Sequence, residues 1–244
     1  MEEDYYVKKT VSEIVENNKE FIAADRSNNP FKKIVPALVT KSLEDLDLSM
    51  FSPETRACLL EALGDEYVRR GNLPNAVKAF LIAQLPDKIV SVGQSYEILQ
   101  EHDKAIEAYR LANDMGRLRS LADRCLADGR FDSARKAYTM LGDKDKLRHV
   151  GEICLQRGKW DTALEVFNEL DDKEWIIKVG ELCVKELEYK LAEKAFEMAK
   201  DPQLLSTLGD ICLKQGHIGQ AFNCYGKAGN NVMVEFIKMN FANR

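Results

Sequence analysis

Thiols are the side chains of this sequence best suited to chemistry, because four of its six cysteines recur with a 29-residue spacing. These four are Cys125, Cys154, Cys183 and Cys212. Equivalent positions on packed helices lie about 9–10 Å apart, whereas a disulfide needs Cα atoms within about 7 Å. No C-x-x-C pair suggests zinc, and Tyr67 and Tyr96 hold the same position earlier in the chain. We interpret the position as core packing, with a redox or metal ladder as the alternative.

The histidines do not form a comparable series. His102, His149 and His217 stand at three different places within the 29-residue spacing, so they would not converge on one site. The sequence has no glycine-rich phosphate loop, no nucleophile elbow and no H-E-x-x-H motif. We therefore expect no enzyme, no cofactor and no metal site.

Acidic side chains form a second series with the same spacing. It consists of Asp65, Gln94, Asp123, Glu152, Glu181 and Asp210. Three residues after each member comes a mostly apolar series, made of Val68, Glu97, Leu126, Leu155, Val184 and Leu213. Acidic and apolar strips side by side suit a partner segment that carries basic and apolar residues.

A solvated surface is the alternative for the acidic series. Arg119 and Arg148 lie four residues before Asp123 and Glu152. That is the spacing of exposed helical ion pairs, which are worth about 0.2–0.5 kcal/mol each.

A sixfold repeat positions both series. A small residue recurs at Gly64, Gly93, Ala122, Gly151, Gly180 and Gly209. Twelve residues later comes an alanine, at Ala76, Ala105, Ala134, Ala163, Ala192 and Ala221. Four residues after that comes an aromatic, at Phe80, Tyr109, Tyr138, Phe167, Phe196 and Tyr225. A fixed period of this length predicts a solenoid of stacked repeats, each burying its apolar face against its neighbours.

Each repeat resolves into two helices. Leu or Ile four residues before the small residue, and Leu or Val one residue before it, form an apolar stripe with the Cys/Tyr position. The small residue lets the partner helix approach closely. Glycines at 71, 129, 158 and 216 end the first helix. Asp or Asn recurs between repeats as an N-cap, at Asp114, Asp143, Asp172, Asp201 and Asn230.

The two ends depart from the repeat. We expect one amphipathic helix at about residues 4–25, and a second around 31–41 that Pro36 kinks or splits. Ser52-Pro53-Glu54 then starts a helix. At the other end, residues 231–244 predict a capping helix. Met233, Phe236 and Met239 add apolar surface there, and the alternative is that they form a dimer or docking contact.

Charge and hydropathy narrow the class of partner. The net charge is -5 and the pI about 5.4, which disfavours a nucleic-acid binder. No apolar run is long enough to span a membrane, and the acidic start does not resemble a secretory signal. We expect a cytoplasmic protein.

The repeat resembles the tetratricopeptide repeat. Leu63, Gly64, Tyr67, Gly71, Ala76, Phe80 and Ala83 stand at that family's offsets, and the other five repeats follow with substitutions. The family has a 34-residue period, so five positions are missing here, and the superhelix pitch and groove shape stay open. The short hairpins also resemble those of coat and vesicle-trafficking proteins.

The resemblance implies that the first helices line a concave groove that holds a partner segment, with the acidic series along it. A known variant grips a C-terminal carboxylate with Lys and Asn. Here Glu61 and Asp65 stand in the first repeat, which disfavours that mode.

The sequence thus predicts an all-α, right-handed α-solenoid. Its parts are an N-terminal helical cap (1–57), six repeats (58–230) and a C-terminal capping helix (231–244). We expect a scaffold or adaptor that binds another protein or peptide, with a homodimer through the last helix as an added option. The alternative is a structural strut in a larger coat or trafficking-type assembly, which contacts its partners through its ends.

Overall fold

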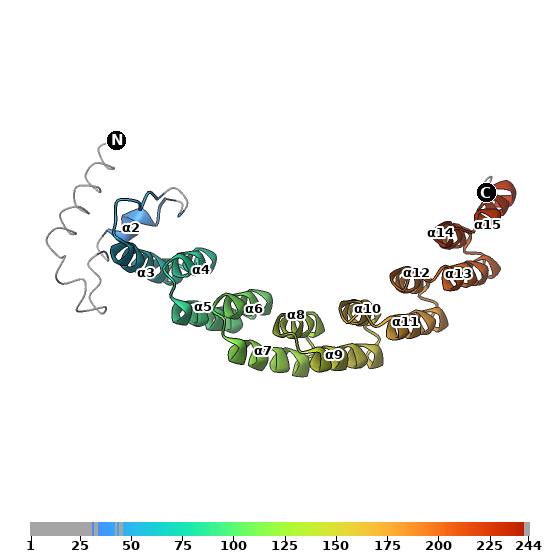
Figure 1. Ribbon diagram of the computed structural model, residues 1–244, viewed down its shortest axis with the longest axis horizontal. Helices are drawn as coiled ribbons and strands as arrows, with labels where there is room; N and C mark the ends of the chain where they lie inside the picture. Colours follow the sequence, from blue (N-terminus) through green and yellow to red (C-terminus); the bar gives the residue numbers. More distant parts are fainter. Residues whose placement is uncertain (1–30, 32–33, 42, 44–45, 242–244) are drawn as a thin grey trace. The chain divides into compact units, whose positions relative to one another are not determined.

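The computed structural model describes residues 31, 34–41, 43 and 46–241 (Figure 1). The amphipathic helix expected at residues 4–25 lies outside this range, as do residues 242–244. Within the described residues the chain is built of consecutive α-helices without a strand. It forms two compact units, Met1–Leu121 and Ala122–Arg244, and their boundary falls inside α7.

Helices pair in chain order. In the first unit these are α2 (Val35–Leu38), α3 (Pro53–Arg69), α4 (Leu73–Ile82), α5 (Pro86–Ile98) and α6 (His102–Leu111), followed by the start of α7 (Met115–Ala127). The second unit continues with α8 (Phe131–Leu141), α9 (Lys144–Gln156), α10 (Trp160–Glu169), α11 (Lys173–Lys185), α12 (Tyr189–Met198), α13 (Pro202–Lys214), α14 (Ile218–Ala228) and α15 (Asn231–Phe241). The fold is an all-α repeat solenoid.

In the second unit the two helices of each repeat lie on opposite sides. The second helices α8, α10, α12 and α14 contact one another in order. Within this unit Figure 1 shows them on the inner side of its curve, with the first helices α9, α11 and α13 on the outer side. The outward surface of α7, α9, α11, α13 and α15 is called the first-helix face below.

Each hairpin closes where an aromatic ring lies against a small residue, which is glycine in five of the six repeats. A Cβ built on Gly180 would lie 2.5 Å from Phe196 Cε1, and one on Gly64 would lie 2.3 Å from Phe80 Cε1. Real side chains essentially never come this close, so the ring occupies the space that a methyl group would fill. This confirms the packing role expected for the small residue.

The aspartate caps are also confirmed. The Asp143 carboxylate accepts a hydrogen bond from the Lys146 N–H at 3.1 Å, and Asp201 accepts from Leu204 N–H at 3.0 Å. Each cap satisfies a backbone donor that has no partner within its own helix. Ser52 does the same for Thr55 at 3.3 Å, so α3 starts where the sequence predicts.

Both turns of the repeat use a left-handed residue, although the sequence indicated only the first. After the first helix, Gly71, Gly129, Gly158 and Gly216 all have positive φ, and Gln100 and Leu187 take the same conformation in the other two repeats. After the second helix, positive φ recurs at Gln84, Asn113, Gly142, Asp171, Lys200 and Gly229. Only two of these six are glycines, which explains why the second turn gave no composition signal.

The stretch at 31–41 corrects one expectation. Among its described residues only Val35–Leu38 is α-helical, and Pro36 stands in the first turn of this short helix rather than at a kink. Proline is tolerated there because the N–H it lacks has no helical partner. Phe31 and Val35 are buried, and the Phe31 ring meets that of Phe51 edge-on, with 6.4 Å between centroids.

The repeated cysteines lie in the core. Cys125, Cys154, Cys183 and Cys212 are all buried, and none of the six cysteines forms a disulfide. This confirms the packing interpretation. Burial is the main cause that raises the pKa of the Cys154 and Cys183 thiols to about 11, and that of Cys224 to about 12.

Adding a methyl group at Gly180 tests the ring-on-glycine contact. Gly180→Ala should destabilise the fold by about 1–3 kcal/mol, because the new Cβ overlaps the Phe196 ring. Gly219→Ala is the matched control: no atom lies within 4 Å of a Cβ there, so a small gain of about 0.5–1 kcal/mol is expected. Urea unfolding followed by circular dichroism measures both. Equal effects would contradict the contact.

The buried thiols predict alkaline destabilisation. In the unfolded chain they ionise near pH 8.5, whereas in the fold their raised pKa keeps them protonated up to about pH 11. Stability is therefore fully present below about pH 8.5 and falls as the pH rises through this window. Cys183→Ala should be less stable at pH 7.5 but lose less with pH, by up to about 1.4 kcal/mol per pH unit. Urea midpoints from pH 7.5 to 10.5 check this, and parallel curves would refute it.

Candidate partner-binding face

The acidic series lies on exposed positions of the first helices. Asp65 and Gln94 are exposed on α3 and α5 of the first unit. In the second unit Asp123, Glu181 and Asp210 are exposed and Glu152 is half-exposed. The accompanying series, at positions 68, 97, 126, 155, 184 and 213, is half-buried throughout. The period thus places acidic and apolar groups side by side on the surface of each unit.

A cation from the next first helix neutralises early members of the series. Lys88 Nζ lies 2.7 Å from the Asp65 carboxylate. Lys146 Nζ lies 3.2 Å from that of Asp123. The two lysines occupy equivalent positions of their repeats, near the start of α5 and of α9.

Gln94 is bound in the same way. In the amide orientation that satisfies both groups, Arg117 Nη1 donates to the Gln94 oxygen at 2.6 Å. Arg117 holds the position in its repeat that Lys88 and Lys146 hold in theirs. Lys88, Arg117 and Lys146 therefore bind the first three members of the acidic series, which are Asp65, Gln94 and Asp123.

Tyrosines of the second helices bind some of the same acids. Tyr138 Oη donates to Asp123 at 2.7 Å, and Tyr225 Oη donates to Asp210 at 2.5 Å. Burial, and then the bond to Asp210, raise the pKa of Tyr225 above its usual value. These acids are therefore partly structural, because each one anchors the aromatic that closes its hairpin.

Glu152 and Glu181 lack both kinds of partner, since their repeats close with phenylalanine and no lysine or arginine of the described chain binds them. Among the described residues Glu181 makes no hydrogen bond or ion pair. Glu152 has only His149, whose Nδ1 lies 3.7 Å away and attracts it only when the imidazole is protonated. Arg148 does not form the i, i+4 pair with Glu152; it donates to Asp172 at 2.7 Å instead.

Apolar side chains replace the cations beside the later acids. The repeat position that holds Lys88 and Lys146 earlier in the chain holds Trp175, Leu204 and Met233 here, after Glu152, Glu181 and Asp210 in turn. All three apolar residues are half-buried. Trp175 stacks on Phe167 with 5.1 Å between ring centroids, and Lys178 Nζ lies 4.8 Å from the Trp175 ring. The later first helices therefore present carboxylates that are not paired with a cation of the next first helix, and these lie next to partly exposed apolar side chains.

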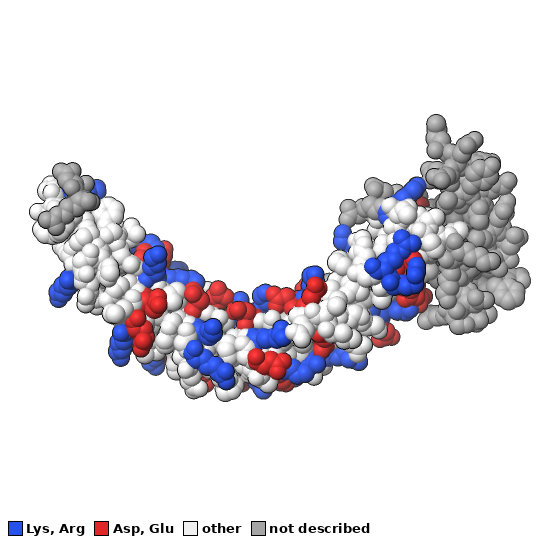
Figure 2. Space-filling view, turned by 180° about the vertical axis from the view of Figure 1, so that it is seen from behind, with Lys and Arg blue, Asp and Glu red and all other residues white. Residues whose placement is uncertain are grey.

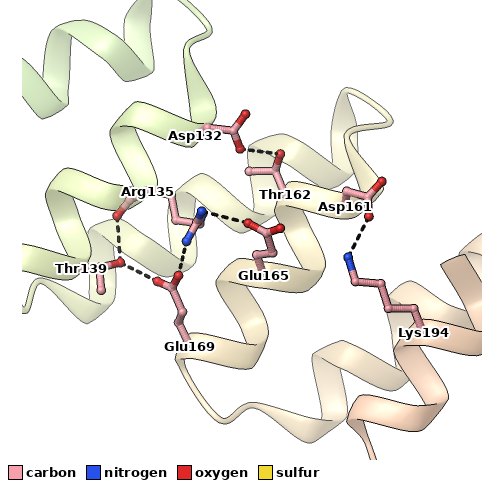
Figure 3. A network of polar contacts seen from close by, with 8 residues as sticks. All are labelled: Asp132, Arg135, Thr139, Asp161, Thr162, Glu165, Glu169 and Lys194. Atoms are coloured by element: carbon pink, nitrogen blue, oxygen red, sulfur yellow. Dashed lines mark hydrogen bonds and ion pairs between the residues drawn. The ribbon is translucent and has the colours of Figure 1, made fainter. Parts of the chain in front are cut away.

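The opposite face of the second unit is occupied by its own ion pairs (Figure 3). Arg135 of α8 reaches both Glu165 (2.9 Å) and Glu169 of α10. Figure 3 also shows Asp161 of α10 paired with Lys194 of α12, at 3.0 Å. The partners lie slightly more than one repeat apart in the sequence, a spacing that sequence reasoning missed although opposite charges recur at it.

Two further sets of contacts complete this network. Thr139 and Thr162 donate to Glu169 and Asp132, at 2.5 and 3.0 Å. Lys227 of α14 binds Glu193 (2.9 Å) and Glu197 (2.6 Å) of α12. The acidic side chains of these second helices are thus bound by side chains of neighbouring second helices. Carboxylates without such a partner are found on the first-helix face instead.

The apolar residues expected at the C-terminal end are placed on α15. Met239 is 81% exposed and Phe236 45% exposed, whereas Met233 is half-buried. Val232, which sequence reasoning did not single out, is 79% exposed. Its i, i+4, i+7 spacing with Phe236 and Met239 could have marked it as part of one stripe.

The described part of the chain also bears on membrane and metal functions. No helix there is long and apolar enough to cross a membrane. No group of three or more His, Cys, Asp or Glu side chains there is arranged to hold a metal ion.

Comparison with known proteins supports the repeat type. The sequence profile of the tetratricopeptide repeat matches residues 90–115, which span most of α5 and α6. No curated protein matches the sequence significantly. With the offsets of all six repeats, this makes the chain a tetratricopeptide-like helical repeat protein, a type that generally mediates contacts between proteins.

Two solved structures are similar over most of the chain. The Cut9-Hcn1 hetero-tetramer of the APC/C has 17% identity and a TM-score of 0.26, with 93% of this chain and 50% of that one covered. A circular tandem repeat protein with novel repeat topology has 12% identity and a TM-score of 0.23, with 86% and 52% covered. The chain thus spans about half the length of each.

Removing a tyrosine hydroxyl tests whether Asp210 is structural. Tyr225→Phe should lower stability by about 1.5–3 kcal/mol, the usual contribution of a hydrogen bond to a charged group. Tyr67→Phe is the matched control, since its buried hydroxyl has no hydrogen-bond partner among the described residues and its loss should cost nothing. Thermal and urea unfolding compare the two. If both variants lose the same stability, the bond to Asp210 contributes nothing.

Proposed function

We propose that this chain is a cytoplasmic scaffold or adaptor that binds a protein segment along the first-helix face of its second unit. The segment carries basic and apolar residues. The observation that carries the proposal is Glu181, an exposed carboxylate without a partner in the described structure, beside the half-buried side chain of Val184.

Charge complementarity selects the partner. Glu152 and Glu181 are the members of the acidic series that no lysine, arginine or tyrosine of the described chain holds. A lysine or arginine of a partner could occupy them at little cost, because no internal ion pair to a lysine or arginine has to break. Leu155, Val184 and Leu213 would supply apolar contact beside them.

The proposed surface is the outer side of the unit rather than a hollow in it. The resemblance implied a concave groove lined by first helices, while Figure 1 places the second helices on the inner side of this unit. The proposal needs only the exposed acids and the half-buried apolar residues beside them, and both lie on the first helices.

A second candidate function is a strut that meets its partners through its ends. The exposed side chains of Val232, Phe236 and Met239 on α15 favour it. In that case the acids of α9 and α11 would be ordinary solvated groups. The experiment below separates the two candidates.

Charge reversal of the two open acids tests the proposal. A fluorescent peptide of alternating Lys and Leu should bind the wild type more tightly than a Glu/Leu peptide of equal length. The double variant Glu152→Lys/Glu181→Lys should weaken binding of the Lys/Leu peptide at least about ten-fold, which corresponds to about 1.4 kcal/mol. Fluorescence anisotropy gives both Kd values.

The control carries the same charge change elsewhere. Glu186→Lys/Asp171→Lys reverses two exposed acids whose repeat equivalents include Arg157 and Lys200, so lysine fits both sites. Glu186 is five residues beyond Glu181 and thus about 140° around the helix. If this control weakens binding equally, net charge and not the first-helix face explains the effect. If neither double variant matters, the strut is favoured.

A further inference from the structure

The exposed apolar stripe of α15 lies in register with the acids of the preceding helices. Met239 stands one repeat period after Asp210, so on α15 it occupies the position that the acidic series holds on the earlier first helices. Phe236 and Val232 follow Thr207 and Gln203 in the same way. The stripe is therefore the continuation of the first-helix face.

This stripe is not the surface where a second helix would close a hairpin. That surface is marked by the small residue of each repeat, and on α15 its position holds Lys238. Lys238 is exposed and pairs with Glu235 at 2.7 Å. A lysine there cannot receive an aromatic ring as Gly209 receives Tyr225, so the closing side of α15 is polar while its first-helix side is apolar.

The first-helix face thus changes character along the second unit. The three equivalent surface positions hold Asp145, His149 and Glu152 on α9, Glu174, Lys178 and Glu181 on α11, Gln203, Thr207 and Asp210 on α13, and Val232, Phe236 and Met239 on α15. Formal charge at these positions falls in magnitude from -2 on α9 to zero on α15. Figure 2 agrees, since charged side chains thin out toward the C-terminal end in the view drawn.

We propose that this gradient selects a directional partner: a segment with basic residues at one end, over α9 and α11, and apolar residues at the other, over α15. This rests on the proposed function and deepens it. Glu152 and Glu181 have no lysine or arginine partner among the described residues and attract such a cation, whereas the α15 stripe offers only dispersion contacts and burial of apolar area. A segment in which basic and apolar residues are interleaved would instead bring a charged side chain against Val232 and Met239.

Geometry sets the spacing of the basic residues. Successive first helices lie on the order of 10 Å apart, and an extended chain in the polyproline II conformation advances about 3.1 Å per residue with three residues per turn. An extended partner therefore brings one side chain to each helix every three residues or so. About nine residues span the face from Glu152 to Met239.

Peptides of one composition and different order test the proposal. Two blocked peptides carry Arg at every third position in one half, and Leu, Phe and Met at every third position in the other, in either order. A third peptide interleaves the same residues. One blocked peptide should bind the full chain at least about ten-fold more tightly than the interleaved peptide, by fluorescence anisotropy.

Variants locate the apolar end. Val232→Ser/Met239→Ser should bring the Kd of the favoured blocked peptide to that of the interleaved one. Both sites are about four-fifths exposed, so the fold is kept. Leu187→Ser is the matched control, because Leu187 is 66% exposed in a turn away from this face; it should leave binding unchanged.

The outcomes separate this inference from the proposed function. If Glu152→Lys/Glu181→Lys weakens all three peptides while their order is irrelevant, the proposed function stands and the directional inference fails. If no variant matters, both fail. If sedimentation equilibrium of the chain alone shows a dimer that Val232→Ser/Met239→Ser dissolves, the stripe binds a second copy and the inference is overturned.

Discussion

The structure depends on one contact that recurs from hairpin to hairpin: an aromatic ring of the second helix against the bare backbone of the first. At Gly180 and Phe196 this contact leaves no room for a methyl group. It sets the depth to which the two helices approach, and so which side of each first helix remains outside. The acidic series follows the small residue by one position, so the contact that closes the hairpin also points these acids to solvent.

The same contact explains which acids are structural. Where the ring is tyrosine, its hydroxyl passes the first helix and needs an acceptor at the surface, and Asp123 and Asp210 supply it. Where the ring is phenylalanine, as at Phe167 and Phe196, there is no hydroxyl for the neighbouring acid to bind. Availability of a surface carboxylate thus depends on the aromatic residue in the core and also on the cation of the next repeat, since Asp65, whose repeat closes with Phe80, is held by Lys88.

Much of this was readable in the sequence because it follows a 29-residue period. The glycine series, the aspartate caps and the buried cysteines each follow from a residue type at a fixed offset. The cations at Lys88 and Lys146 were missed although they also recur, because their meaning depends on which helices become neighbours. The left-handed turn at Lys200 was missed because lysine carries no signal for that conformation, and only the closing of the neighbouring hairpin requires it.

The ion pairs along the second helices have a mechanical consequence. Arg135, Lys194 and Lys227 each connect one hairpin to the next through partly exposed contacts, so ions in solution weaken them. The buried rings within each hairpin are insensitive to salt. Higher ionic strength should therefore loosen the contacts between successive second helices of the second unit, while each hairpin stays intact.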